Sequence, residues 1–122
     1  MPAKSAPHAL IIEDEMIIAL EVEDLLRGVG FATFDVAATP EEAVDQATRQ
    51  RPDLITADVR ILGGTGIEAV QAITRELGEI PYFYVTGNVD MLKDVDAARI
   101  VEKPINAHHF RRACAVAGGT VG

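Results

Sequence analysis

Five residues with chemically active side chains stand at the ends of four separate apolar runs. Glu13 and Asp14 directly follow one run, and Asp58 ends another. Thr86 ends a third run, and Lys103 follows a fourth. Carboxylates that pack together repel one another, and a hard divalent cation removes that repulsion. Oxygen ligands suit Mg²⁺, which takes one or two carboxylates and keeps several waters, so the acidic residues are candidate ligands for this ion.

The same residue types suit phosphoryl transfer. A carboxylate can attack phosphorus and form an aspartyl phosphate. The transferring group carries spread negative charge, which cations and hydrogen-bond donors stabilise. Lys103 would place a point charge on one phosphoryl oxygen, and the Thr86 hydroxyl would donate to another. We predict that Asp58 is the nucleophile because it is the last residue of a buried central run.

The elements that must position these residues alternate between strand and helix. Apolar, β-branched runs predict strands at residues 8–13, 31–36, 53–58, 81–86 and 99–102. Helical spacing of apolar residues predicts helices over 16–26, 39–51 and 67–77 and after Pro104. This alternation indicates an α/β fold with a parallel sheet and right-handed crossovers. For five strands the common doubly wound order is 2-1-3-4-5, with helices on both faces.

That strand order brings the candidate residues to one edge of the sheet. Strands one and three are neighbours, and their carboxyl ends flank the topological switch point, where open α/β sheets build their sites. Glu13, Asp14 and Asp58 would lie at this point. The fourth and fifth strands would bring Thr86 and Lys103 to the same edge.

Composition limits the function classes. The chain has 122 residues, which predicts one domain, and a formal net charge of −8, which argues against binding to nucleic acid or to an anionic membrane. A single cysteine, Cys114, excludes an internal disulfide, and we expect it to be buried. Residues 1–7 lack the apolar core of a secretory signal, so we expect a flexible, cytoplasmic N-terminus, a domain over 8–117 and a flexible tail over 118–122.

Three further features have simple interpretations. Residues 63–66 are rich in glycine but lack the Gly-Lys-Ser/Thr ending of a nucleotide loop, so we expect a flexible connector. His108 and His109 precede two arginines on the last predicted helix, so we expect both to be exposed. Thr39, Pro40 and Glu42 predict a capped helix start with a capping box.

The ordered set of Glu13-Asp14, Asp58, Thr86 and Lys103-Pro104 resembles the signature of two-component response-regulator receiver domains over about residues 8–117. The resemblance implies a flavodoxin-like or CheY-like fold in which Asp58 accepts phosphate from a histidine kinase. It also implies direct Mg²⁺ ligation by Asp14, Asp58 and the backbone carbonyl of Arg60, with Glu13 acting through water.

The segment from Pro81 to Asn88 is similar to the Pro-Phe-x-Phe-Ala-Thr-Gly-Tyr motif of the "FAT GUY" receivers, which are mostly alphaproteobacterial and in some cases act in general stress signalling. Thr86 and Lys103 lie only 17 residues apart, and that subfamily has a reduced fourth helix. Ile100 replaces the aromatic residue that many receivers use as a switch. We therefore expect residues 87–98 to be mobile and to become ordered when Thr86 engages a phosphoryl group.

These observations favour a stand-alone receiver without an output domain over other classes. Such a protein is a phosphoacceptor rather than an enzyme, and its partners would be a histidine kinase and a downstream protein or phosphotransferase, unless it acts as a phosphate sink. One alternative is a pseudo-receiver that binds partners without phosphoryl transfer. Another is a small Mg²⁺-dependent phosphohydrolase with an aspartyl nucleophile, which needs a second acid where this chain has Arg60.

Overall fold

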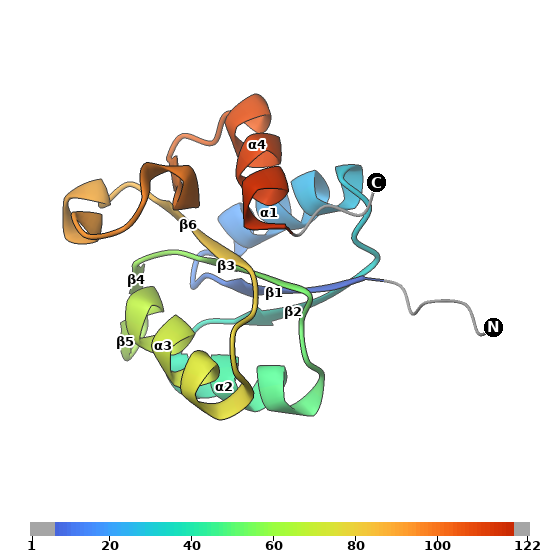
Figure 1. Ribbon diagram of the computed structural model, residues 1–122, viewed down its shortest axis with the longest axis vertical. Helices are drawn as coiled ribbons and strands as arrows, with labels where there is room; N and C mark the ends of the chain where they lie inside the picture. Colours follow the sequence, from blue (N-terminus) through green and yellow to red (C-terminus); the bar gives the residue numbers. More distant parts are fainter. Residues whose placement is uncertain (1–6, 119–122) are drawn as a thin grey trace.

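A parallel sheet of five strands forms the centre of the molecule (Figure 1). The computed structural model describes residues 7–118. The sheet has the order β2-β1-β3-β6-β7, which is the predicted doubly wound order because β6 and β7 are its fourth and fifth strands along the chain. The strands are β1 (His8–Ile12), β2 (Thr33–Ala37), β3 (Leu54–Ala57), β6 (Tyr82–Thr86) and β7 (Ile100–Glu102).

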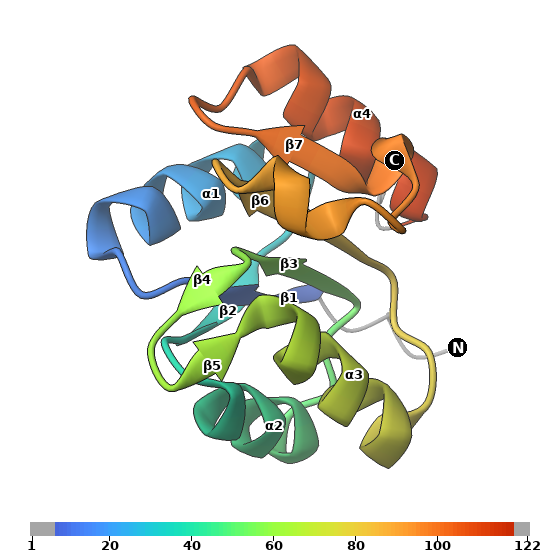
Figure 2. The same ribbon diagram turned by 90° about the vertical axis from the view of Figure 1, so that its left-hand side faces the viewer.

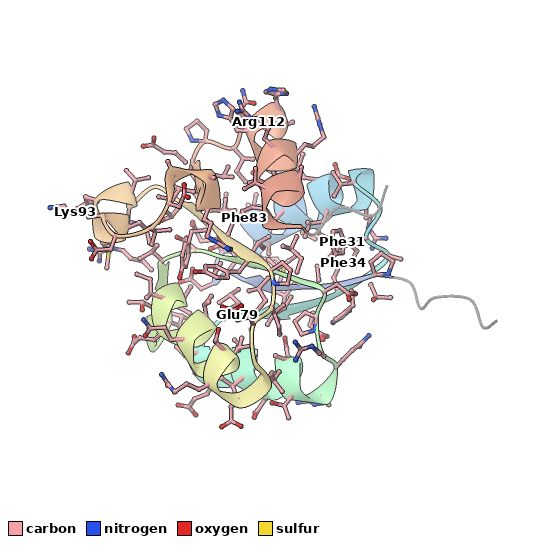
Figure 3. The ribbon with its side chains drawn as sticks, in the orientation of Figure 1. Phe31, Phe34, Glu79, Phe83, Lys93 and Arg112 are labelled. Carbon is pink, nitrogen blue, oxygen red and sulfur yellow. The ribbon has the colours of Figure 1, made fainter. Side chains whose placement is uncertain are left out.

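Helices cover both faces of this sheet, as Figure 1 shows. On one face α1 (Met16–Gly28) and α4 (Ala107–Ala117) enclose an apolar cluster, in which the rings of Phe83 and Phe110 meet edge to face at 5.2 Å. Phe83 lies at the centre of the molecule in Figure 3. On the other face α2 (Pro40–Arg49) and α3 (Gly66–Leu77) enclose a second cluster. Both faces of the central strands are therefore buried, which explains why their sequences are continuous apolar runs.

The predicted helix signals are largely confirmed. The Thr39 side chain accepts a hydrogen bond from the backbone N–H of Glu42 at 3.1 Å, and Pro40 is the first helical residue of α2. The capping box predicted here is wrong in one half, because the Glu42 carboxylate accepts from the N–H of Ala38 rather than from that of Thr39. His108 and His109 are exposed, as predicted.

The glycine-rich segment differs from its prediction. Instead of a flexible connector it forms an antiparallel hairpin of β4 (Arg60–Ile61) and β5 (Gly64–Thr65), visible in Figure 2 beside the start of α3. Thr65 and Glu68 then form a complete capping box at the N-terminus of α3. Backbone pairing within the hairpin and the capping of α3 explain why this segment is ordered rather than flexible. Strands of two residues have no periodicity, so the sequence pattern does not reveal them.

The crossover from β6 to β7 contains no α-helix. It consists of two short 3₁₀ turns, η1 (Val89–Leu92) and η2 (Ala97–Arg99), which confirms the predicted reduction of the fourth helix. The other crossovers of the sheet each contain an α-helix. The crossover between β6 and β7 therefore covers its part of the sheet with two short turns instead of a helix.

The first helix buries only part of its apolar surface. Ala19, Val22 and Leu26 pack against the sheet. Met16, Ile17 and Leu20, in contrast, are 63%, 81% and 56% exposed, and we call these three residues the α1 apolar stripe. Helical spacing predicted the helix but did not show which apolar residues face solvent.

Two buried residues lie away from the sheet edge that carries the candidate site. The His8 ring contacts the Thr33 hydroxyl at 2.8 Å and the Asp35 carboxylate at 2.9 Å, which links β1 to β2. Cys114 is buried in α4, as predicted. Within residues 7–118, no helix combines the length and the apolar character that a membrane crossing requires.

Candidate functional site

Three carboxylates meet at the carboxyl edge of the sheet. Glu13 and Asp14 follow β1, and Asp58 follows β3, which pairs with β1. One oxygen from each carboxylate lies within 4.8 Å of the others. Glu13 and Asp58 are buried, whereas Asp14 is exposed and leaves the cluster open to solvent. The structure thus brings together the three acids that the sequence placed at the switch point.

Lys103 lies against the same cluster from the end of β7. Its ammonium donates to Asp58 Oδ2 at 2.8 Å and to Glu13 Oε1 at 3.1 Å. The carboxylate of Glu15, which the sequence analysis did not single out, lies 3.9 Å from the same ammonium. A cation on a flexible stem can move from a carboxylate to a phosphoryl oxygen without a change in the backbone.

Backbone contacts fix Asp58 in place. Its N–H donates to the Ile12 carbonyl at 2.9 Å, and its Oδ1 accepts from the N–H of Val59 at 2.6 Å. Gly66 packs so closely that a Cβ atom at this position would lie 1.8 Å from the Asp58 carbonyl oxygen. No local sequence pattern marks Gly66, because a tertiary contact makes glycine necessary there.

Thr86 completes the edge from β6. It is fully buried, and its Oγ1 accepts a hydrogen bond from the N–H of Asn88 at 3.0 Å. The Thr86 carbonyl accepts from the N–H of Lys103 at 3.0 Å, which ties the strand to the residue that follows β7. Arg60 of β4 contacts the loop that follows β6, because its Nε donates to Asn88 Oδ1 at 3.2 Å. The hydroxyl proton of Thr86 remains available for a further acceptor.

Burial and charge set the protonation of the site. Burial raises the pKa of Glu13 to about 7, the nearby Asp58 carboxylate acts in the same direction, and the N–H of Glu15 and the Lys103 ammonium oppose them. Burial alone would lower the pKa of Lys103, but its hydrogen bond to Asp58 and the charge of Glu13 raise that pKa above the ordinary value. Lys103 is therefore a cation throughout the physiological range.

The pKa of Glu13 gives a pH prediction. Metal binding requires the carboxylate form, so we expect the Mg²⁺ affinity of the protein to increase as pH rises through 7, by up to about tenfold per pH unit below that value. Without metal, a pKa raised above that of the unfolded chain stabilises the fold at low pH and loses this effect as pH rises from 4.5 to about 7. Calorimetric titration with Mg²⁺ at several pH values measures the first effect. The variant Glu13→Gln should flatten that dependence, and a dependence equally steep in the variant would contradict the assignment.

The donor set fits a magnesium ion. Three carboxylates at one open edge offer oxygen ligands only, and the one positive charge of Lys103, which contacts two of them, does not balance three negative charges. A hard divalent cation would relieve this excess charge, and the exposed Asp14 leaves an entry path. Arg60, whose carbonyl is predicted to be a further ligand, is the first residue of β4, two positions after Asp58.

Comparison with known proteins gives the family. Residues 9–115 match the response regulator receiver domain. The chain belongs to this family. Its fold, with a five-stranded parallel sheet and helices on both sides, is the receiver fold, and receiver domains act in two-component signalling through phosphorylation and Mg²⁺ binding. A CheY-like receiver domain from Methylobacillus flagellatus, 22% identical, has the same fold with a TM-score of 0.78 over 93% of this chain and 99% of its own.

Relatives of this receiver domain include PhyR proteins. The phyllosphere-induced regulator PhyR of Methylorubrum extorquens is 39% identical over 88 residues, which are 70% of this chain and 33% of that protein. The receiver domain of Erythrobacter litoralis PhyR is 30% identical, with a TM-score of 0.79 over 92% of this chain and 89% of its own. The chain thus spans about a third of the length of the first of these relatives.

Other relatives match the receiver domain over most of their length. Sporulation initiation phosphotransferase F of Bacillus subtilis is 30% identical over 85% of this chain and 87% of that protein. The receiver domain of the sensor histidine kinase PA1611 from Pseudomonas aeruginosa, 23% identical with a TM-score of 0.76, covers 93% of this chain and 99% of its own, and it has a magnesium ion coordinated in its active site cleft.

Proposed function

We propose that this receiver domain accepts a phosphoryl group on Asp58 from a histidine kinase, in a Mg²⁺-dependent reaction, and that the modification switches its protein–protein interactions. The contact between the Lys103 ammonium and Asp58 Oδ2 at 2.8 Å is the observation that carries the proposal. Glu13 has contacts of the same kind, from the Lys103 ammonium at 3.1 Å and from the N–H of Glu15 at 3.2 Å. Those of Asp58 are shorter, at 2.8 and 2.6 Å, and Asp58 directly follows the central strand β3.

Each residue of the site has a role in that reaction. An Asp58 oxygen attacks the phosphorus of the phosphohistidine, a P–O bond forms, and the P–N bond breaks as the imidazole leaves with its electron pair. Lys103 moves with the developing charge from Asp58 to a phosphoryl oxygen, and the Thr86 hydroxyl donates to another. When bound, Mg²⁺ neutralises charge on the carboxylates and on the phosphoryl group. Asp14, Asp58 and the Arg60 carbonyl would hold it directly, with Glu13 acting through water.

The output of this switch is a second part of the proposal. We assign the chain to the FAT GUY type of receiver, on the Pro81–Asn88 segment and the short crossover. PhyR from Bartonella quintana, 29% identical, is named an anti-anti-sigma factor, and another PhyR structure, 32% identical, is named a stress response regulator, which supports a role in stress signalling. The domain would act through a downstream protein or phosphotransferase, or as a phosphate sink. The α1 apolar stripe (Met16, Ile17 and Leu20), next to the acidic cluster in sequence, would contact the kinase.

The decisive experiment is phosphorylation of the purified protein. Incubation with acetyl phosphate and Mg²⁺, followed by intact mass measurement, should show one added phosphoryl group that disappears when Mg²⁺ is chelated beforehand. A lasting absence of the modified species would support a pseudo-receiver instead. Continuous turnover of a phosphomonoester would support a phosphohydrolase.

The crossover should respond to phosphorylation. In the structure the N–H of Asn88 bonds the Thr86 hydroxyl, so a phosphoryl group that draws Thr86 toward it must pull on the first residues of the crossover. We expect amide exchange over residues 87–98 to slow by about tenfold or more when a phosphoryl mimic binds, since about 1.4 kcal/mol of added protection corresponds to tenfold. Hydrogen exchange with and without beryllofluoride measures this. Unchanged protection across the segment, with protection changing near Asp58, would refute the proposed switch.

The contact between Arg60 and Asn88 should affect the lifetime of the phosphorylated form. These side chains meet at 3.2 Å and close the loop after β6 onto β4. Loss of the contact in Asn88→Ala should admit water and shorten the lifetime by a few-fold, because an attacking water needs an open approach to the phosphorus. Decay of the phosphorylated mass in excess chelator gives the rate. Lys93→Ala, on the same crossover but directed outward, is the matched control (Figure 3). Equal lifetimes in both variants would contradict the prediction.

A further inference from the structure

A cavity of about 840 Å³ lies between α3 and the crossover, away from the acidic cluster. Apolar residues of α3 and the crossover line it, among them Ile67, Val70, Met91 and Val95, together with Tyr82 and Tyr84 of β6. Polar side chains of α3, Gln71, Thr74 and Arg75, also line it. It exists because the crossover forms two short turns where the other crossovers of the sheet have α-helices. Its volume is in the range of small-ligand sites, which are about 300–1,000 Å³.

Tyr84 brings a hydroxyl without a partner to this cavity. Only 3% of the surface of Tyr84 is exposed to solvent. The structure nevertheless gives its hydroxyl no hydrogen bond to any of residues 7–118. Within residues 7–118, Gln46 Oε1 is the one side-chain polar atom that is both fully buried and without a hydrogen-bond partner. The Tyr84 hydroxyl is therefore not fully buried and remains accessible. A nearly buried hydroxyl of this kind usually has a partner, so its position at a cavity indicates a place for one.

Arg99 supplies a cation beside the two tyrosines. Its guanidinium lies 4.4 Å from the centre of the Tyr82 ring and donates to the Tyr82 carbonyl at 2.8 Å, so the side chain is held in place. The Tyr82 and Tyr84 rings meet edge to face at 5.7 Å. Burial raises the pKa of Tyr84 to about 12, the neighbouring Tyr82 acts in the same direction, and the positive charge of Arg99 acts against this rise. At neutral pH the cavity therefore presents a neutral phenol and a fixed cation.

We propose that the cavity is a binding site for a small organic carboxylate with a compact apolar or aromatic body. The Arg99 guanidinium and the tyrosine hydroxyls are donors that match a carboxylate, and the surrounding aliphatic and aromatic side chains match an apolar body. Two acids, Glu79 and Asp94, also line the cavity, but both are exposed and solvent screens their charge. A cationic ligand would instead meet the half-buried Arg99.

The position of the cavity connects it to β6. Tyr82, Tyr84 and Thr86 alternate along this strand and so lie on the same face of the sheet. Met91 and Val95 of the cavity wall belong to the segment that begins beside Thr86. Binding in the cavity does not depend on phosphorylation of Asp58, so its test is independent of the function proposed above.

The proposal is tested by titration of the ¹⁵N-labelled chain with benzoate. We expect saturable shifts of the amide signals of residues 80–84 and 91–99. Benzyl alcohol, which has the same ring without the charge, and benzylammonium, which has the opposite charge, should each bind about tenfold more weakly or worse, because a charge-assisted hydrogen bond is lost. Shifts that do not saturate, or equal binding of benzyl alcohol or benzylammonium, would overturn the proposal.

Two variants assign the binding to these residues. Tyr84→Phe removes a single oxygen and should weaken benzoate binding several-fold while the remaining amide signals stay in place. Arg99→Gln should weaken it further. Lys93→Gln is the matched control, because Lys93 points away from the molecule in Figure 3, and it should bind benzoate like the unaltered protein. Unchanged affinity in Tyr84→Phe would overturn the proposal even if Arg99→Gln fails to fold.

Discussion

Replacement of Asp58 by asparagine is expected to abolish phosphoryl labelling. The amide keeps the size of the side chain but removes the nucleophilic oxygen. Glu13, which also contacts Lys103, remains in this variant, but its contacts with the ammonium and with a backbone N–H are longer than those of Asp58. Labelling with acetyl phosphate and Mg²⁺ should fall by at least about a hundredfold, which corresponds to the loss of roughly 3 kcal/mol of transition-state stabilisation. Intact mass measurement over a time course gives the extent.

The control for this variant is Asp45→Asn. Asp45 is exposed on α2, so its replacement makes the same chemical change outside the site and should leave labelling unaffected. Thermal melting and an amide spectrum establish that both variants are folded. Full labelling of the Asp58→Asn protein would place the phosphoryl group elsewhere and would remove the basis of the proposed function.

Replacement of Gly66 by alanine is expected to disrupt the fold around Asp58. The added Cβ atom would lie 1.8 Å from the Asp58 carbonyl oxygen and 3.2 Å from the Ala57 side chain, and backbone atoms cannot give way as a flexible side chain does. Overpacking of this kind costs about 3 kcal/mol or more, so the melting temperature should fall by roughly 10 °C or more. A calorimetric melt measures the change, and labelling of any folded fraction shows whether Asp58 still reacts.

Gly28→Ala is the matched control. A Cβ atom at Gly28 would meet no atom within 4 Å, and the residue ends α1 without a positive φ angle. Its replacement should change the free energy of unfolding by less than about 1 kcal/mol. Equal melting temperatures of the two variants would show that Gly66 tolerates a side chain and that the close approach does not position Asp58.

The sequence predicted the sheet and the convergence of the acids because both follow from local patterns. Continuous apolar runs mark strands buried on both faces, and the doubly wound order brings the ends of strands one and three together. Glu13, Asp14 and Asp58 could therefore be placed near one another without coordinates. Lys103 directly follows the last strand, β7, and this position likewise predicts its contacts with the acids at the same edge.

Other features depend on tertiary contacts that a local pattern does not contain. The β4–β5 hairpin has strands of two residues, too short for a periodic signal, and it is ordered by pairing and by the capping of α3. Met16 and Ile17 have helical spacing but stay exposed, because the packing of α1 against the sheet uses Ala19 and Val22. The contact of Gly66 with Asp58 joins residues eight positions apart through the backbone alone.

The thin crossover between β6 and β7 also makes the domain a scaffold for insertion. Its two turns carry no strand pairing, and doubling the length of such a connection costs only about 0.6 kcal/mol in closure entropy. A foreign peptide or a small reporter module inserted between Leu92 and Asp96 would leave the sheet order intact while joined to a segment that starts beside Thr86, at the sheet edge that carries Asp58. The same architecture could thus be turned into a sensor whose optical signal follows kinase activity.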